Sequence, residues 1–166
     1  LGRFPEALPL QEEALTGHRR LFPDGHPDVA VCLGNLVTIY GALGRDAERL
    51  PLAEEALAMR RWLLPGDNPH VASSLSLLAA VQGALGRGEE ALARHQEALV
   101  MLRRVFPGDH PQVAEGLHHL GYAQGVLGNH AQALALAEEG LAMTRRLSPG
   151  DHPRVASSLH QVGAGL

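Results

Sequence analysis

The chain repeats itself every 42 residues. The stretch Phe106 to Ala114 reads Phe-Pro-Gly-Asp-His-Pro-Gln-Val-Ala, and close copies occur at 22–30, 64–72 and 148–156. Their first prolines are Pro23, Pro65, Pro107 and Pro149. A fixed period of this length indicates stacked units that bury their faces on one another, instead of one domain around a single central core.

Each copy of this stretch is expected to end one helix and begin the next. The first proline and the glycine both interrupt a helix, whereas the second proline suits the first helical position, where its missing N–H would have no partner anyway. The residue before that proline then occupies the N-cap, and these residues are His26, Asn68, His110 and His152. We treat the four copies as one recurring turn.

Two sets of helices alternate between these turns. Apolar residues at helical spacing predict longer "B helices" at 4–21, 46–63, 88–105 and 130–147. Shorter "A helices" are predicted at 27–42, 69–84, 111–126 and from Pro153 to the end. A Leu-Gly-Arg or Leu-Gly-Asn sequence at residues 1, 43, 85 and 127 forms the tight turn between an A helix and the B helix that follows it.

Each A helix carries one ladder of apolar residues at spacings of three and four, which places them on one side of the helix, facing the following B helix. The ladders are Leu33, Leu36 and Tyr40; Leu75, Leu78 and Gln82; Leu117, Leu120 and Gln124; and Leu159 and Val162. Arg49 stands where the other B helices have Ala7, Ala91 and Ala133, so we expect looser packing in that helix pair.

The composition excludes several classes of protein. All 14 basic residues are arginine and the net charge is −4, which disfavours binding to nucleic acid. The bias towards Ala, Leu, Gly and Arg is typical of a GC-rich bacterial genome. The single cysteine, Cys32, cannot form an internal disulfide and is expected to pack as a small apolar group. No run of about 18 apolar residues is present, so we expect a cytoplasmic protein without a membrane contact.

The residues Leu117-x-x-Leu120-Gly121, Gly128 and Ala133 resemble the tetratricopeptide repeat pattern. The period of 42 residues and the sequence Gly-Asp-His-Pro-x-Val-Ala are similar to the kinesin-light-chain type of this repeat. HEAT and armadillo repeats have a comparable period but would not be expected to repeat these motifs. The resemblance implies a right-handed all-α solenoid of about eight helices, one repeat array over 1–166 with 42-residue blocks beginning at 1, 43, 85 and 127. We expect it to be part of a longer protein.

In that family the A helices line a groove that holds a segment of a partner protein. The side of the A helices opposite the apolar ladders therefore predicts a partner-binding groove formed by Asn35, Thr38, Ser73, Ser76, His118, His119, Tyr122, His160 and Gln161. These residues could equally coat a solvent-facing surface. The predicted function is a protein-interaction scaffold. The alternative is a regulatory or sensor arm of a larger signalling or effector protein, such as an ATPase or a protease.

Catalytic and metal-binding chemistry is not indicated. The chain has no Gly-x-Ser-x-Gly, phosphate-binding loop or His-Glu-x-x-His sequence, so we expect neither an enzyme nor a cofactor. His118 and His160 occupy the same position of adjacent A helices and could approach one ion. Because no cysteine or carboxylate pair completes the set, we expect no metal site.

The predicted groove carries no lysine or arginine, and Asn35 is its only residue matching the carboxylate clamp of tetratricopeptide proteins that bind chaperone tails. His118, His119 and His160 are its only groups able to gain positive charge, which an unperturbed histidine does near pH ~6.5. The prediction is that affinity for an acidic peptide grows as the pH falls from ~7.5 to ~5.5, because histidines gain a positive charge over that range. Head-to-tail self-association is also predicted, through Leu8 and Leu15 at one end and Leu159 and Val162 at the other.

Overall fold

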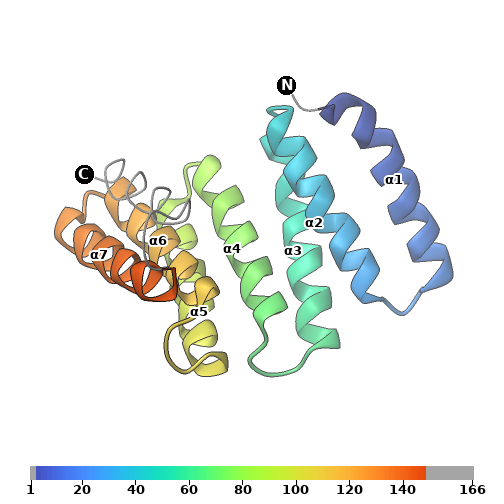
Figure 1. Ribbon diagram of the computed structural model, residues 1–166. Coiled ribbons are helices and arrows are strands. Elements are labelled where there is room, and N and C mark those ends of the chain that lie inside the picture. Colours follow the sequence, from blue (N-terminus) through green and yellow to red (C-terminus); the bar gives the residue numbers. More distant parts are fainter. Residues whose placement is uncertain (1–2, 149–166) are drawn as a thin grey trace.

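The computed structural model describes residues 3–148, which form seven α-helices and contain no strand. They are α1 (Phe4–Leu21), α2 (Pro27–Ala42), α3 (Asp46–Leu63), α4 (Pro69–Ala84), α5 (Gly88–Val105), α6 (Pro111–Val126) and α7 (His130–Leu147). The helices follow one another across the molecule from α1 to α7 (Figure 1). The predicted all-α fold and the bounds of these helices are confirmed. The A helix predicted from Pro153 onward, with Leu159 and Val162, lies outside the described residues.

The predicted N-caps explain why the A helices begin where they do. The residue before each helix-opening proline is extended, and its side chain accepts a hydrogen bond from the backbone N–H two residues later. These bonds measure 3.2, 2.8 and 3.2 Å for His26, Asn68 and His110. Each bond satisfies one of the donors that a helix start leaves without a partner.

The tight turn inside each helix pair depends on a glycine. Gly44, Gly86 and Gly128 have φ angles of 71°, 76° and 80°, which only glycine adopts at no steric cost. The backbone N–H of the next residue then donates to the carbonyl five positions earlier, at 2.9 Å in all three turns. This arrangement ends the A helix and reverses the chain within a few residues.

The first of the recurring turns differs from the next two. Its aspartate and glycine are in reversed order, and Gly25 has the positive φ of 96°. Gly66 and Gly108 take that conformation one position earlier in their turns. The N–H of Gly25 also donates to the carbonyl of Phe22 at 3.1 Å. The prediction that this turn repeats the others is therefore wrong in its backbone.

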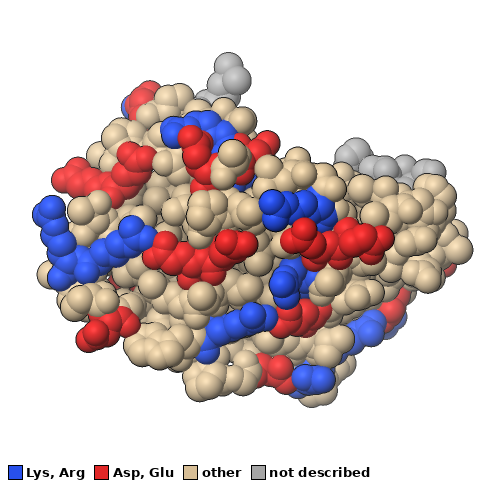
Figure 2. Space-filling model, turned by 180° about the vertical axis from the view of Figure 1, so that it is seen from behind, with Lys and Arg blue, Asp and Glu red and all other residues tan. Residues whose placement is uncertain are grey.

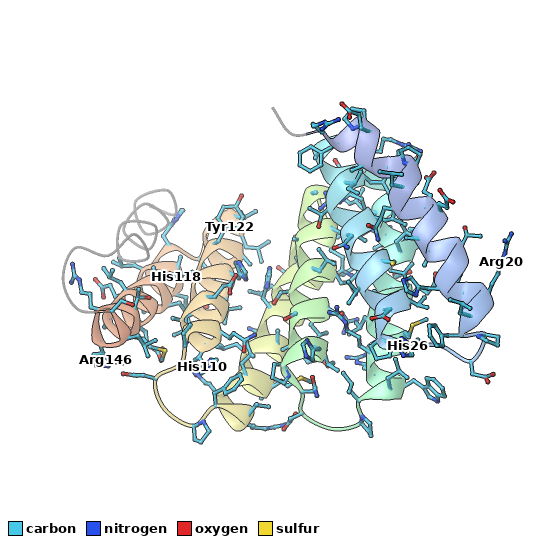
Figure 3. The ribbon with its side chains drawn as sticks, turned by 45° about the vertical axis from the view of Figure 1, so that its right-hand side comes forward. Arg20, His26, His110, His118, Tyr122 and Arg146 are labelled. Carbon is cyan, nitrogen blue, oxygen red and sulfur yellow. The ribbon has the colours of Figure 1, made fainter. Side chains whose placement is uncertain are left out.

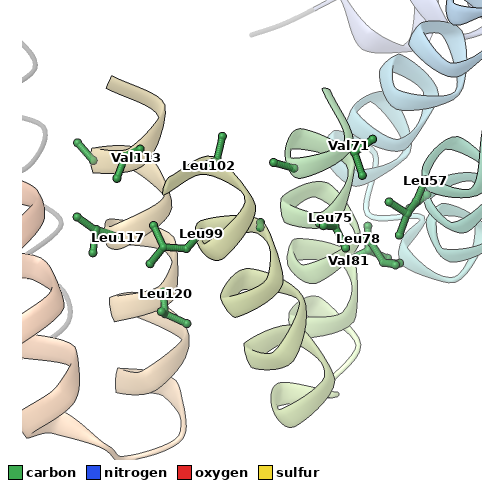
Figure 4. Packing of buried hydrophobic residues seen from close by; sticks show 14 of the residues in the cluster. Leu57, Val71, Leu75, Leu78, Val81, Leu99, Leu102, Val113, Leu117 and Leu120 are labelled. Atoms are coloured by element: carbon green, nitrogen blue, oxygen red, sulfur yellow. The ribbon is translucent and has the colours of Figure 1, made fainter. Parts of the chain in front are cut away.

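The predicted apolar ladders form the core. Leu33, Leu75 and Leu117 are fully buried, and the second leucine of each ladder is at most 7% exposed. Figure 4 shows the leucines of the second and third ladders between neighbouring helices, with Leu99 of α5 close to Leu117 of α6. One cluster of buried residues runs from α2 to α7 and a smaller one joins α1, α2 and α3. The stack is thus held together by contacts between neighbours along the chain.

The third position of each ladder is polar and buried, and each such side chain has a hydrogen bond. The Tyr40 hydroxyl donates to Glu12 at 2.8 Å, and the Gln82 amide donates to Glu90 at 2.9 Å. The amide oxygen of Gln124 accepts from Asn129 at 2.8 Å. Because a buried polar group without a partner is costly, these bonds reduce the cost of ending the ladders with polar residues, although the buried Oε1 of Gln82 has no partner among residues 3–148.

Arg49 takes the place of a small residue in the α2–α3 pair and forms polar contacts there. Its Nε donates to the carbonyl of Val37 at 3.1 Å, and its Nη1 forms an ion pair with Asp46 at 2.6 Å. The guanidinium lies against Gly41, where a Cβ atom would be 2.8 Å from Cζ of Arg49. The absence of a side chain at Gly41 therefore provides the space for the guanidinium, and the looser packing expected in this helix pair stays a prediction.

The B helices are joined by a ladder of ion pairs at the surface. Arg19, Arg61 and Arg103 bind Glu55, Glu97 and Glu139 of the next B helix at 2.6, 2.5 and 2.7 Å. Figure 2 shows acidic and basic side chains lying next to one another over the face seen from behind. All six side chains are more than a third exposed, so each pair contributes only about 0–1 kcal/mol.

The apolar residues predicted to be open at the N-terminal end are largely covered. Leu15 is 7% exposed and packs in the smaller core cluster, and Leu8 is half-buried beside it. The most exposed large apolar side chains of α1 are instead Leu10 and Leu21, at 68% and 72%, followed by Phe4 at 36%. The choice of Leu15 for self-association is therefore wrong, while self-association itself stays a prediction.

Cys32 is 6% exposed and packs among apolar residues of the smaller cluster, as predicted. Burial and the nearby Asp28 raise the pKa of its thiol. None of the helices between residues 3 and 148 combines the length and apolar character needed to cross a membrane.

Candidate groove between helices α4 and α6

A groove separates the two A helices α4 and α6 and has α5 beneath it. It consists of two cavities of about 300 and 620 Å³ that share Ser76, Ala80 and His119. The smaller cavity is also lined by Ala72, Ser73, Leu77, Leu102, Gln112, Glu115 and Gly116. The larger is also lined by Ala79, Gly83, Ala84, Gly88, Ala91, His95, His118, Tyr122, Ala123 and Val126.

Small residues on α4 keep this groove open. Its wall is formed by residues such as Ser76, Ala80 and Gly83, which are too short to reach α6. The larger Leu77, which also lines the smaller cavity, extends towards α2, and its Cδ2 would be 3.7 Å from a Cβ atom at Gly34 of α2. A larger side chain thus approaches α2, whereas the side towards α6 stays hollow.

The α6 wall carries the larger polar and aromatic residues. Tyr122 is 65% exposed at the mouth of the groove, and His119 is half-buried. In Figure 3, Tyr122 and His118 lie along α6 on the side away from the turn that contains His110. The groove is thus asymmetric: its α4 side is formed mainly by small residues, and its α6 side carries histidine and tyrosine rings.

His118 is buried at 8% exposure because α7 makes room for it. A Cβ atom at Gly140 of α7 would be 2.8 Å from Cε1 of His118. Burial, and to a smaller degree the neighbouring His119, lower the pKa of His118, with Glu115 acting in the opposite direction. The lowered pKa means that His118 gains a positive charge less readily than an unperturbed histidine, which counts against its predicted role as a cation near pH ~6.5.

His95 forms part of the groove and was not among the predicted site residues. It lies on α5, is 8% exposed, and its ring centre is 5.5 Å from that of His119. Burial, followed by the proximity of His119, lowers the pKa of His95 to about 4. Its Nδ1 atom is buried and has no hydrogen-bond partner among residues 3–148. The sequence repeat could have pointed to His95, because the positions equivalent to it in the other B helices hold Gln11, Ala53 and Ala137 and no histidine.

The structure brings together five of the nine predicted groove residues. Ser73, Ser76, His118, His119 and Tyr122 line the two cavities. Asn35 and Thr38 are exposed on α2 and line neither cavity, and the Thr38 hydroxyl donates to the carbonyl of Gly34 at 3.2 Å. His160 and Gln161 lie outside the described residues.

The histidines of the groove do not form a metal site. Within residues 3–148, no group of three or more histidine, cysteine, aspartate or glutamate side chains has an arrangement that could hold an ion. With a buried His95 whose pKa is about 4, the larger cavity offers an uncharged imidazole at its base and mainly apolar walls. This arrangement suits the binding of an uncharged part of a ligand.

Two segments, residues 1–61 and 70–146, match the family model described as tetratricopeptide repeat. The match spans most of the sequence, so the chain belongs to the tetratricopeptide repeat family. This fold is typically a non-enzymatic scaffold for protein interactions. A comparison with curated protein sequences found no significant match.

Solved structures of kinesin-light-chain-like repeat proteins share the fold. A kinesin light chain candidate from Podosopora anserina with nearly identical TPR-like repeats is 23% identical, with a TM-score of 0.81 over 99% of this chain and 78% of that one. BtubC (BKLC) from P. vanneervenii is also 23% identical, with a TM-score of 0.83 over 99% and 65%. A Rap protein complexed with Competence and Sporulation Factor is 13% identical, with a TM-score of 0.75 over 98% and 49%. The solved structures that share the fold thus include kinesin-light-chain-like repeat proteins, the type that the 42-residue period resembles.

Proposed function

We propose that this chain is a protein-interaction scaffold that holds a segment of a partner protein in the groove between α4 and α6. The observation that carries the proposal is the pair of adjoining cavities between α4 and α6, with small residues on the α4 wall and histidine and tyrosine rings on the α6 wall. The Rap protein complex supports it, because that protein has the same fold and a bound factor.

The chemistry of the groove indicates the character of the segment. The walls of the larger cavity are formed mainly by apolar atoms of Ala79, Ala80 and Ala91, and Tyr122 provides an exposed ring at the mouth. Neutral His95 can accept or donate one hydrogen bond at the base. The segment therefore has an apolar, uncharged centre, and its binding does not depend on protonation of His95, whose pKa is about 4, between pH ~7.5 and ~5.5.

Two matched arginine variants test this proposal. Peptides are selected from a phage-displayed random library on the whole chain, and their affinities are measured for Ala80→Arg and Ala93→Arg. Ala80 is exposed and lines both cavities, whereas Ala93 is exposed on α5 and lines neither. We expect at least about tenfold weaker binding to the first variant and unchanged binding to the second. Equal affinities for both variants, or a selection that yields no binding peptide, would contradict the proposal.

The regulatory-arm alternative depends on domains outside this sequence. A nucleotide-binding or protease domain in the parent gene would favour it, and the groove could then bind a segment of that same protein.

A further inference from the structure

A second hollow lies at the turn between α1 and α2, remote from the groove. This cavity of about 550 Å³, the Trp62 pocket, is lined by Arg19, Phe22, Pro23, Asp24, Gly25, Val29, Glu55, Ala58, Met59 and Trp62. Trp62 is the only tryptophan of the chain and is 64% exposed. A large exposed apolar side chain in a hollow is a common feature of interaction sites.

The other repeats show which residues normally occupy the positions of Trp62 and Gly25. In the next two repeats an arginine at the end of the B helix forms an ion pair with an aspartate of the preceding turn. These pairs are Arg104 with Asp67 at 3.6 Å and Arg146 with Asp109 at 2.6 Å. The equivalent residues in the first repeat are Trp62 and Gly25. The pocket thus arises where an ion pair is replaced by an aromatic ring and a residue without a side chain.

The altered turn and the tryptophan fit one another. A Cβ atom at Gly25 would be 3.3 Å from Cζ3 of Trp62, so the ring packs closely over the glycine. The reversed order of residues also places a carboxylate, Asp24, where the other turns have Gly66 and Gly108. The substitutions in the turn and at the end of α3 therefore form one local structure.

The charges lining the pocket leave one anionic group without a partner. Glu55 accepts two hydrogen bonds from Arg19, at 2.6 and 2.7 Å, so those two charges are paired. Asp24 is exposed and forms no ion pair with any residue in 3–148. Arg20, the other nearby cation of α1, extends away from the body of the molecule in Figure 3. The uncompensated charge of the pocket is therefore negative.

We propose that the Trp62 pocket binds an arginine or lysine side chain of a partner protein. A tryptophan face is the strongest aromatic attractor of a cation, and the Asp24 carboxylate can pair with the same charged group. Phe22, Val29 and Met59 offer apolar surface to the aliphatic part of such a side chain. This site is separate from the α4–α6 groove and does not depend on the function proposed for it.

The test is an NMR titration of the whole chain with the peptide acetyl-Gly-Arg-Gly-Arg-Gly-amide. Its control is the same peptide with citrulline, which keeps the shape of arginine but is uncharged. We expect the shifts to centre on the Trp62 indole and the Gly25 amide, and the citrulline peptide to bind about three- to thirtyfold more weakly. Equal binding of the two peptides would show a purely apolar surface and overturn the proposal.

Variants locate the site and separate it from general attraction to an acidic protein. Trp62→Gln leaves the net charge unchanged and should weaken binding of the arginine peptide by a similar factor. The triple variant D24G/G25D/W62R copies the turn and ion pair of the next repeats, so it should fold and lose the shift changes at residue 25. Ala80→Arg, in the groove, should bind the peptide as before. Wild-type affinity in Trp62→Gln or in the triple variant would refute the assignment.

Discussion

At the scale of single residues, the informative positions are those where one repeat departs from the others. His95 replaces the alanine of Ala53 and Ala137 and becomes a buried, neutral histidine at the base of the groove. Trp62 and Gly25 replace an arginine and an aspartate and open a pocket. Each of these residues can be replaced by the residue that occupies the equivalent position in another repeat, and that residue is already compatible with the fold.

The lowered pKa of His95 makes the stability of the fold depend on pH. The pKa is about 4 in the folded chain and ~6.5 when unfolded, so the unfolded state binds more protons between these values. Stability contributed by the neutral side chain is complete above pH ~6.5 and is lost as the pH falls towards ~4. We expect the free energy of unfolding to fall by about 1–2 kcal/mol through this group between pH 7 and pH 5.

Urea titrations of the wild type and His95→Ala at the two pH values measure this contribution. The variant has the residue found at Ala53 and Ala137 and should lose about 1–2 kcal/mol less between pH 7 and pH 5. An identical loss in both proteins would show that His95 is not held neutral by burial.

At the scale of helices, facing positions compensate one another in size. One position of the A helices is occupied by Gly34, Ser76 and His118 in successive repeats. The B helix that follows each of them has Ala56, Ala98 or Gly140 at the position 22 residues later. The largest of these A-helix residues, His118, thus lies against the smallest of these B-helix residues, Gly140. A Cβ atom at Gly140 would be only 2.8 Å from Cε1 of His118. The α6–α7 pair accommodates a buried histidine by giving up a methyl group on α7.

This compensation predicts opposite effects of one substitution in two backgrounds. In the wild type, Gly140→Ala places a methyl group against the His118 ring, and such overpacking typically costs ~1–3 kcal/mol. In a His118→Ser background, which copies Ser76 opposite Ala98, the same change should stabilise the protein by up to about 1 kcal/mol through helix propensity. A double-mutant cycle from denaturant titrations should give a coupling of ~1–3 kcal/mol. Additive effects would mean that the ring moves aside without cost.

Sequence reasoning predicted the helices well for a local reason. Prolines, glycines and capping residues recur at fixed positions, so the residues that begin and end each helix are visible without any knowledge of packing. The site was predicted less well because its properties depend on other helices. The burial of His118, which lowers its pKa, depends on Gly140 of α7, and the inclusion of His95 follows from α5 lying beneath the groove. Neither relation is visible in the A helices themselves.

At the scale of the whole molecule, stability is distributed along the stack. The larger cluster of buried residues extends from Val37 of α2 to Met143 of α7, whereas the cluster that contains Leu15 involves only α1, α2 and α3. Helix α1 packs mainly on α2, while each of α3, α4, α5 and α6 packs on the helix before it and the helix after it. In such an array the contribution of a residue depends on how many neighbouring units its contacts hold together.

The position of a leucine in the stack should therefore determine how much its loss costs. Leu78 and Leu120 lie in the larger cluster at 4% and 7% exposure, and Leu→Ala at such sites typically costs ~2–5 kcal/mol. Leu15 has the same exposure of 7%, but it joins a terminal helix to one neighbour, so Leu15→Ala should release α1 without unfolding the rest. Hydrogen exchange in that variant should be faster in α1 and unchanged in α4 to α6, whereas Leu78→Ala should accelerate exchange in the helices on both sides of α4. Uniform acceleration over all helices in the Leu15 variant would mean that the chain unfolds as a single unit and does not behave as a stack of neighbours.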